Sequence, residues 1–208
     1  MVDSNEGRVK FAMIRCGYGR DMESQDDKYF ERNVTEAERV GIPWGTYLYS
    51  YALNTESAKS EAEHVLRLLK GKNPQFPVAF DMEDADGYKK RHGMPSNAVL
   101  ADICDVFLSE MEKHHPVLLY ASLYWLNNKL NSPKLERYPK WVAQWSIGCT
   151  YTKPYDMWQF TSDGSVAGIS GRVDLNYCYK DYLGPQPISQ KPSTQTQQAS
   201  KPVKKYQV

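Results

Sequence analysis

The sequence lacks several patterns that accompany common enzyme chemistries. Its histidines (His64, His92, His114 and His115) show no H-x-x-x-H or mixed Cys/His spacing, so we expect structural or solvated roles and no metal site. Gly17-Tyr18-Gly19 lacks the third glycine of a dinucleotide loop, and no G-x-x-x-x-G-K-[ST] or G-x-S-x-G motif occurs. These absences argue against phosphate cradling and α/β-hydrolase chemistry, and we expect no cofactor.

Charge and hydropathy exclude two further classes of partner. The formal net charge is +1, so no global field directs the protein to nucleic acid or membrane. We interpret the basic clusters Lys89-Lys90-Arg91 and Lys204-Lys205 as solvated faces. No apolar run approaches the roughly twenty residues needed to cross a bilayer. We therefore expect no nucleic-acid partner and no membrane insertion.

Cysteine is scarce, and none of the four residues has C-x-x-C spacing. Cys16 and Cys104 lie in apolar stretches, which favours buried free thiols over a disulfide framework. The N-terminal MVDSNEGR also lacks the charged-then-apolar pattern of a signal peptide. From the sequence alone, three alternatives remain open: the protein works in the cytoplasm, it is exported by another route, or a leader is missing.

Strand and helix patterns alternate through the first two thirds of the chain. Apolar runs predict strands over 9–15, 46–52, 76–81 and 117–121. Helical spacing predicts helices from a cap at Asp26 or Asp27 to Gly41, from Thr55 to Lys70, and after Ser96. Beyond 121, only 141–145 and 157–160 are strand-like, with connections too short for full helices. The pattern predicts an α/β domain with a parallel, barrel-like sheet.

The composition changes after Leu183. Residues 184–208 are rich in Pro, Gln, Ser, Thr and Lys and have no apolar period. We therefore expect one folded domain over 1–183 and a disordered linker over 184–208, with a further module beyond it in the parent protein.

A carboxylate pair ends the strand pattern of Pro77-Val78-Ala79-Phe80-Asp81-Met82-Glu83-Asp84. Period-two alternation points Asp81 and Glu83 to one side, about 6.6 Å apart at Cα, with Met82 on the other. Active groups of such folds gather at these strand ends, and glycoside hydrolysis needs one protonated and one ionised acid. An ionised Asp81 would also raise the pKa of Glu83. The alternative is that the two acids begin a solvated loop or cap the next helix.

An ordered set of segments resembles glycoside hydrolase family 25, the lysozymes of phage endolysins and bacterial autolysins. The segments are FAMIRCGYG (11–19), the D-x-x-F-x-x-N run from Asp27, GIPWGTYLYSYA (41–52), PVAFDMED (77–84), LLYAS (118–122), WVAQW (141–145) and MWQFTSDGSVAGISGRVDLNYC (157–178). The resemblance implies an irregular (β/α) TIM-barrel-like domain. It also implies an N-acetylmuramidase (EC 3.2.1.17) that cleaves the β-1,4 bond between N-acetylmuramic acid and N-acetylglucosamine in peptidoglycan.

The resemblance assigns site residues position by position. Glu83 resembles the family's general acid, Asp81 the residue that orients or stabilises the substrate's acetamido group, and Asp174 the acid of its final V-D-L-N strand. It also implies that three aromatic residues, Tyr47, Tyr120 and Trp145, contact the sugar. Core packing is the alternative for each aromatic residue, and helix capping is the alternative for Asp174.

One departure from the family pattern concerns the start of the chain. Family members begin with a strand that carries a G-I-D-V-S-like motif, then a helix, before the strand equivalent to 9–15. Only eight residues precede Val9 here, fewer than a parallel crossover needs, so we expect Asp3 to lie outside the site. We further expect that the first strand and helix are lacking and that the barrel is open.

Three functional hypotheses follow. The first is an active muramidase that acts on the cell wall, either as an endolysin released by host lysis or after export by another route. The second is a catalytically weakened or inactive relative that binds peptidoglycan, because the first strand and its Asp are missing. The third is a structural α/β domain whose acids only decorate a loop.

Overall fold

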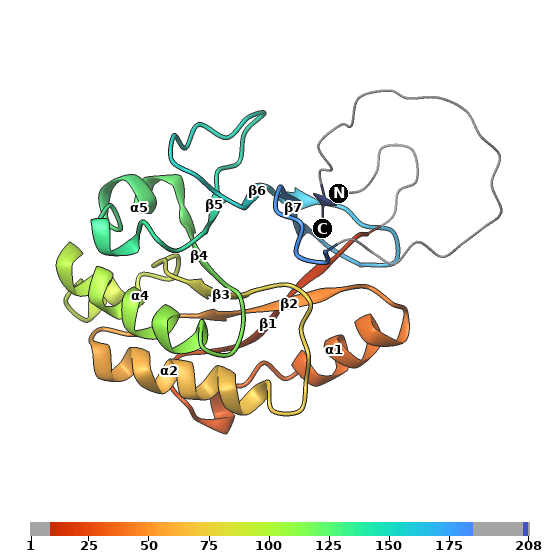
Figure 1. Ribbon diagram of the computed structural model, residues 1–208, viewed down its shortest axis with the longest axis horizontal. Helices are drawn as coiled ribbons and strands as arrows, with labels where there is room; N and C mark the ends of the chain where they lie inside the picture. The colour runs from red at the N-terminus through yellow and green to blue at the C-terminus, as the bar shows by residue number, and fades with distance from the viewer. Residues whose placement is uncertain (1–8, 185–205, 208) are drawn as a thin grey trace.

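The computed structural model describes residues 9–184 and the backbone of 206–207. Its centre is one curled, half-barrel sheet with strand order β1 to β8 (Figure 1). The strands are β1 (Ala12–Tyr18), β2 (Trp44–Tyr49), β3 (Val78–Asp81), β4 (Val117–Ser122), β5 (Lys140–Ala143), β6 (Met157–Gly164), β7 (Val173–Cys178) and β8 (Tyr206–Gln207). Strands β1 to β6 are parallel, whereas β7 pairs antiparallel with both β6 and β8. Within the described residues the sheet is open between its edge strands, β1 and β8.

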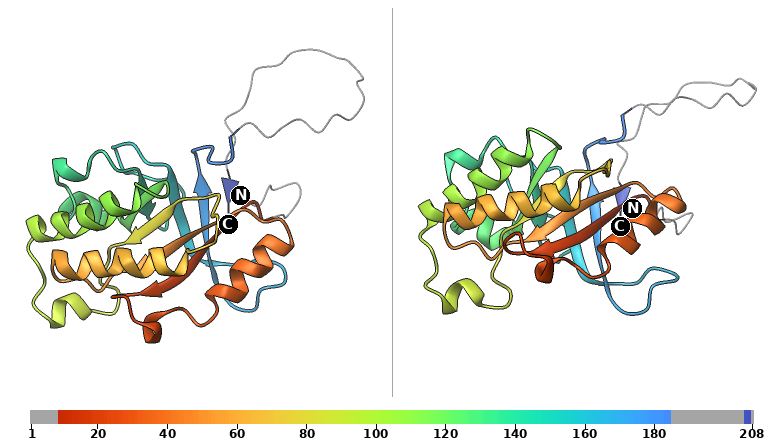
Figure 2. Two further views of the ribbon diagram at one scale, coloured as in Figure 1. Left: turned by 60° about the horizontal axis from the view of Figure 1, so that its bottom comes forward. Right: turned by 90° about the horizontal axis from the view of Figure 1, so that it is seen from below.

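Helices cover the first half of the sheet. The helices are α1 (Phe30–Arg39), α2 (Thr55–Leu68), α3 (Tyr88–Arg91), α4 (Asn97–Met111) and α5 (Leu123–Asn128), with 3-10 turns η1 (Glu23–Gln25) and η2 (Pro133–Leu135). The three longest, α1, α2 and α4, lie along one side of the sheet, and α2 runs beside α4 (Figures 1 and 2). No helix within 9–184 is long and apolar enough to span a membrane.

The two faces of the sheet bury separate apolar clusters. The outer cluster lies between the strands and the helices and includes Phe80, Met82 and Phe107. The inner cluster fills the concave face, with Phe11 stacked on Phe76 at a ring-centroid distance of 4.5 Å. Strands buried on both faces explain the continuous apolar runs of the sequence. The predicted α/β, barrel-like fold is confirmed.

The predicted start of the first helix differs from the structure, because the side chains expected to cap it form ion pairs with other residues. Helix α1 begins at Phe30, with Tyr29 and no side-chain cap at its N-cap position. Asp27 pairs with Arg15 and accepts the Tyr29 N–H, while Asp26 pairs with His64. The predicted cap at Asp26 or Asp27 is therefore wrong. The Ser96 cap is confirmed, since its Oγ accepts the N–H of Val99.

Two strand predictions also need correction. The second strand ends at Tyr49 instead of Ala52, because Glu61 accepts hydrogen bonds from the Ser50 hydroxyl and the Tyr51 N–H. Strand β7 is antiparallel, since the connection over 165–172 is too short for a parallel crossover.

Other predictions hold or lie outside the described residues. All four cysteines are free, and Cys16 and Cys104 are buried as expected. The predicted structural role of His64 is confirmed, because its buried ring bonds Asp26 and the carbonyl of Gly19. Asp3 and most of the predicted linker, 185–205 and 208, lie outside the described residues. Tyr206–Gln207, predicted as part of a disordered linker, instead form β8 against β7, so the prediction is wrong there.

Candidate active site

The carboxylate pair lies at the C-terminal end of β3. Asp81 is the last residue of that strand, and Glu83 follows it by two positions. Both side chains line one cavity of roughly 960 Å³, whereas Met82 is buried in the outer cluster. The alternation predicted from the sequence is therefore confirmed, and both acids face the same space. Their placement in a cavity wall is at odds with the alternative of a solvated loop.

The two acids differ in depth. Asp81 is only 5% exposed, and its Oδ1 has no hydrogen-bond partner among the described residues. Glu83 is intermediate in exposure. An unpaired buried carboxylate oxygen is costly, so it is suited to accept a hydrogen bond from a bound ligand.

Burial controls the protonation of this pair. Burial raises the pKa of Asp81 well above its ordinary value, and the charge of Glu83 raises it further. Burial also raises the pKa of Glu83, while Lys89 opposes the shift in both groups. Asp81 is the more deeply buried acid, so its charged form is disfavoured more than that of an exposed aspartate; its ionisation beside a protonated Glu83 stays a prediction. Because the charge of Glu83 acts on Asp81, the protonation of one acid depends on that of the other.

Asp174 lies across the cavity from β3, on the antiparallel strand β7. It lines the same cavity as Asp81 and Glu83, and partial desolvation raises its pKa. Asn176, two residues later on the same face of β7, accepts a hydrogen bond from Trp141 Nε1 at 2.8 Å. Because Asp174 is part of a strand, the helix-capping alternative is wrong.

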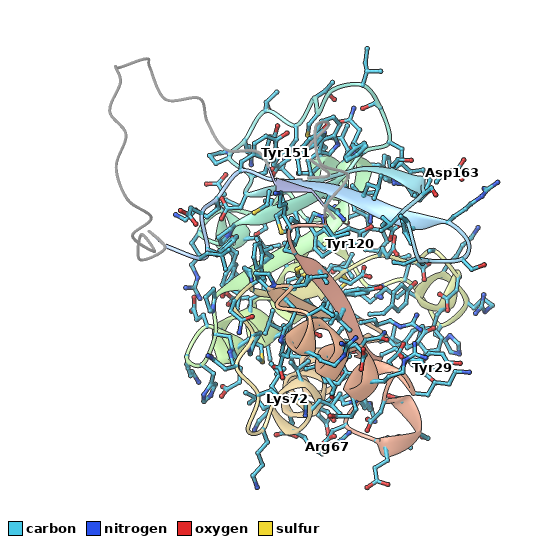
Figure 3. The ribbon with its side chains drawn as sticks, turned by 90° about the vertical axis from the view of Figure 1, so that its right-hand side faces the viewer. Tyr29, Arg67, Lys72, Tyr120, Tyr151 and Asp163 are labelled. Carbon is cyan, nitrogen blue, oxygen red and sulfur yellow. The ribbon has the colours of Figure 1, made fainter. Side chains whose placement is uncertain are left out.

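Tyrosines form part of the cavity wall. Tyr47 on β2 and Tyr120 on β4 both line it, and each ring meets Trp141 edge to face at centroid distances of 6.2 and 4.7 Å. Figure 3 labels Tyr120 between the ribbons of β1 and β7. Burial raises the pKa of both tyrosines, with Asp81 adding to the shift, so the hydroxyls stay protonated and can donate.

Trp145 lies outside the cavity wall but is joined to it. Strand β5 ends at Ala143, and the Trp145 side chain is 66% exposed. Its Nε1 donates to Gln159 Oε1 at 2.9 Å, and the Tyr120 hydroxyl donates to the same oxygen at 3.2 Å. Gln159 itself is buried and lines the cavity, so it connects the exposed indole to the tyrosine beside Asp81.

Several cavity residues were not singled out from the sequence. Arg15 on β1 lines the cavity and donates from Nε to Asp27 Oδ2 at 2.8 Å. Gln159 and Asn176 line the opposite side. Alternation within MWQF and VDLN could have placed the last two on the inner face. Arg15 gave no such signal, because a charged residue inside a strand pattern is ordinarily assigned to solvent.

The comparison with family models decides the family. The sequence model of glycosyl hydrolases family 25 matches residues 3–169. The chain belongs to glycosyl hydrolase family 25. This agrees with the resemblance carried by the sequence segments.

Individual relatives support the family membership. The chain is 26% identical to Lysozyme M1 of Streptomyces globisporus over 179 residues, which cover 81% of this chain and 59% of that protein. It is 28% identical to the autolytic lysozyme of Clostridium acetobutylicum, over 67% of this chain and 40% of that one. The chain thus spans less than two thirds of the length of these relatives.

Solved structures extend the comparison to the fold. The modular autolysin LytC of Streptococcus pneumoniae superposes with a TM-score of 0.73 at 30% identity, over 84% of this chain and 41% of that one. The same autolysin has been solved with a synthetic peptidoglycan ligand. The lysozyme of Streptomyces coelicolor, at 21% identity and a TM-score of 0.68, shares the fold.

Proposed function

We propose that this chain is a lysozyme that hydrolyses the β-1,4 bond between N-acetylmuramic acid and N-acetylglucosamine in peptidoglycan. The observation that carries the proposal is the Asp81–Glu83 pair at the end of one parallel strand, inside a tyrosine-lined cavity. Glycosidic bonds break when one carboxylic acid protonates the leaving oxygen and a second group stabilises the positive sugar centre. Membership of the family and similarity to an autolysin and to curated lysozymes support the proposal.

The depths of the two acids suggest how the roles divide. A substrate acetamido N–H that donates to the unpartnered Oδ1 of Asp81 would stabilise the ionised form and lower the pKa of Asp81. The shared proton would then reside on Glu83, at the more exposed position. Glu83 is thus the general acid, and Asp81 is the group that orients the acetamido function.

The remaining residues of the proposed site act on the sugar. Asp174 adds negative charge on the far wall, where it can stabilise the cation that develops at the anomeric carbon. Tyr47 and Tyr120 offer ring faces for the apolar surface of a pyranose, and Trp145 offers an exposed indole at the edge.

The second candidate is a relative that holds peptidoglycan without cutting it. The half-barrel form of the described sheet favours this candidate, because its edge strands β1 and β8 do not pair with each other and leave the barrel unclosed. Release of reducing ends from purified peptidoglycan supports hydrolysis. Co-sedimentation with the polymer, without any release, supports binding alone. If the protein neither releases reducing ends nor co-sediments with the polymer, only the structural-domain hypothesis remains.

We also propose that 1–183 is the catalytic domain and that 184–208 is a linker to a further wall-binding module, although the two residues of β8 pair with β7. The place of action would be the cell wall, reached by host lysis or by another export route. Truncation after Gly184 should leave the melting temperature within a few degrees of the parent chain and retain hydrolysis. A large drop in melting temperature would instead assign the removed residues to the folded domain.

A further inference from the structure

The loop that carries Glu83 folds back on itself through the short helix α3. The carboxylate of Asp84 accepts the N–H groups of Lys89 at 2.6 Å and Lys90 at 3.0 Å. Gly87 enters the helix with a φ of +70°, a conformation that glycine adopts readily. The Lys89 side chain then returns, and its Nζ donates to the Glu83 carbonyl at 2.8 Å. The main chain of Glu83 is therefore held from within its own loop.

Lys89 also joins this loop to a buried acid on α2. Its Nζ donates to the Ser50 carbonyl, while the Ser50 hydroxyl donates to Glu61 Oε2 at 2.8 Å. Glu61 Oε1 accepts the N–H of Tyr51 at 2.7 Å. Both Lys89 and Glu61 are 0% exposed, so the expectation that Lys89 belongs to a solvated basic cluster is wrong. The ends of β2 and β3 are thus tied to one buried cation and one buried acid.

Titratable and aromatic groups face Lys89 from four directions. Glu61 faces it from α2 and Cys104 from α4, and the Tyr49 ring of β2 lies 5.8 Å from Nζ. The acids of β3 and the following loop, Asp81, Glu83 and Asp84, complete the set.

The effect of Lys89 on the site is electrostatic as well as mechanical. Its cation lowers the pKa of both Asp81 and Glu83, against the burial that raises them. The pKa of Glu83 is raised by three nearby acids, Asp174, Asp86 and Asp84. The pKa of Asp81 is lowered by Arg15. Burying an ammonium group is costly unless it is paired or used, and Lys89 does not line the cavity.

We propose that Lys89 is a positioning residue for the carboxyl pair, fixing the main chain of Glu83 and holding a buried positive charge behind both acids. This role rests on the proposed function, because the pair matters only if it does the chemistry. Lys89 does not line the cavity and would act through Glu83 and Asp81.

The test compares Lys89→Met with Lys90→Met, a matched control in which the lost charge comes from an exposed neighbour on the same helix. Loss of the buried cation raises the pKa of both acids, so the kcat/KM–pH profile should move upward by roughly one pH unit. Lys89→Arg keeps the charge and should return the profile toward the wild-type position. A merely structural role would lower the rate equally at every pH, and that result would overturn the proposal.

Carboxyl titration by NMR separates this inference from the proposed function, because it needs no turnover. In Lys89→Met both acids should titrate at higher pH even if the wild type releases no reducing ends. If Lys89→Met fails to fold, Lys89→Gln removes the same charge but keeps a hydrogen-bond donor for the Ser50 and Glu83 carbonyls. Both acids should again titrate at higher pH, because the same cation is lost. An unchanged titration in a folded variant contradicts the proposal.

Discussion

Asp81 on β3 and Tyr120 on β4 are register partners, and both side chains line the cavity. Burial, and then the charge of Asp81, raise the pKa of Tyr120, so its hydroxyl remains a donor across the working pH range. That hydroxyl donates to Gln159, which also receives the indole N–H of Trp145. A single amide oxygen thus links Tyr120, on the strand beside β3, to Trp145 at the outer edge of the cavity.

Tyr120→Phe keeps the ring and removes this link. We expect a loss of about 0.5–1.5 kcal/mol in the free energy of unfolding, because Gln159 loses one donor. We also expect slower hydrolysis, because the hydroxyl lies in the cavity wall. Tyr138→Phe is the matched control, since its hydroxyl donates to Asp105 at 2.7 Å away from the cavity. Equal losses of activity in the two variants would contradict a specific role for Tyr120.

Asp81→Asn should lower turnover and raise stability at neutral pH. Since burial raises the folded-state pKa of Asp81, wild-type stability falls as the pH rises above the ordinary aspartate pKa of about 3.9. Asparagine removes that cost, so its advantage in urea unfolding should be larger at pH 7 than at pH 4. Asp163→Asn is the control, because Asp163 is exposed and paired with Arg172. An Asp81→Asn advantage that does not change with pH would contradict the assignment.

Trp145→Ala tests whether the exposed indole binds glycan. Because the side chain is 66% exposed, we expect little change in melting temperature. The loss of an aromatic contact of about 0.5–1.5 kcal/mol should raise KM by roughly two- to tenfold while kcat changes less. Ile147→Ala, a fully exposed apolar position on the same loop, should leave KM unchanged. A KM that is unaffected in Trp145→Ala would remove Trp145 from the substrate-binding set.

The sequence predicted those features of the fold that depend on a single strand or a single helix end. Alternation along β3 placed Asp81 and Glu83 in one space and Met82 in the core. The Ser96 cap followed from the residue type before an apolar helical stripe. Such features need only the backbone geometry of a single strand or helix end.

Buried charge could not be predicted in the same way. Glu61 lies on the apolar stripe of α2, and Lys89 lies in a run of basic residues that resembles a solvated face. Their burial depends on Ser50, a residue of a third segment that bonds both of them. The antiparallel β7 likewise depends on the length of the loop before it. These features arise from contacts between segments that are distant in the sequence. The hydrophobic period within one segment cannot predict such contacts.

The most direct measurement is the rate of reducing-end release from purified peptidoglycan by Glu83→Gln. Glutamine keeps the shape of the side chain but cannot deliver a proton, so we expect a rate about 10²- to 10⁴-fold below wild type. Glu63→Gln, an exposed position on α2, should retain the wild-type rate, and both variants should keep the wild-type circular dichroism spectrum. Near-full activity of a folded Glu83→Gln variant, alongside an active wild type, would show that the general acid is another residue.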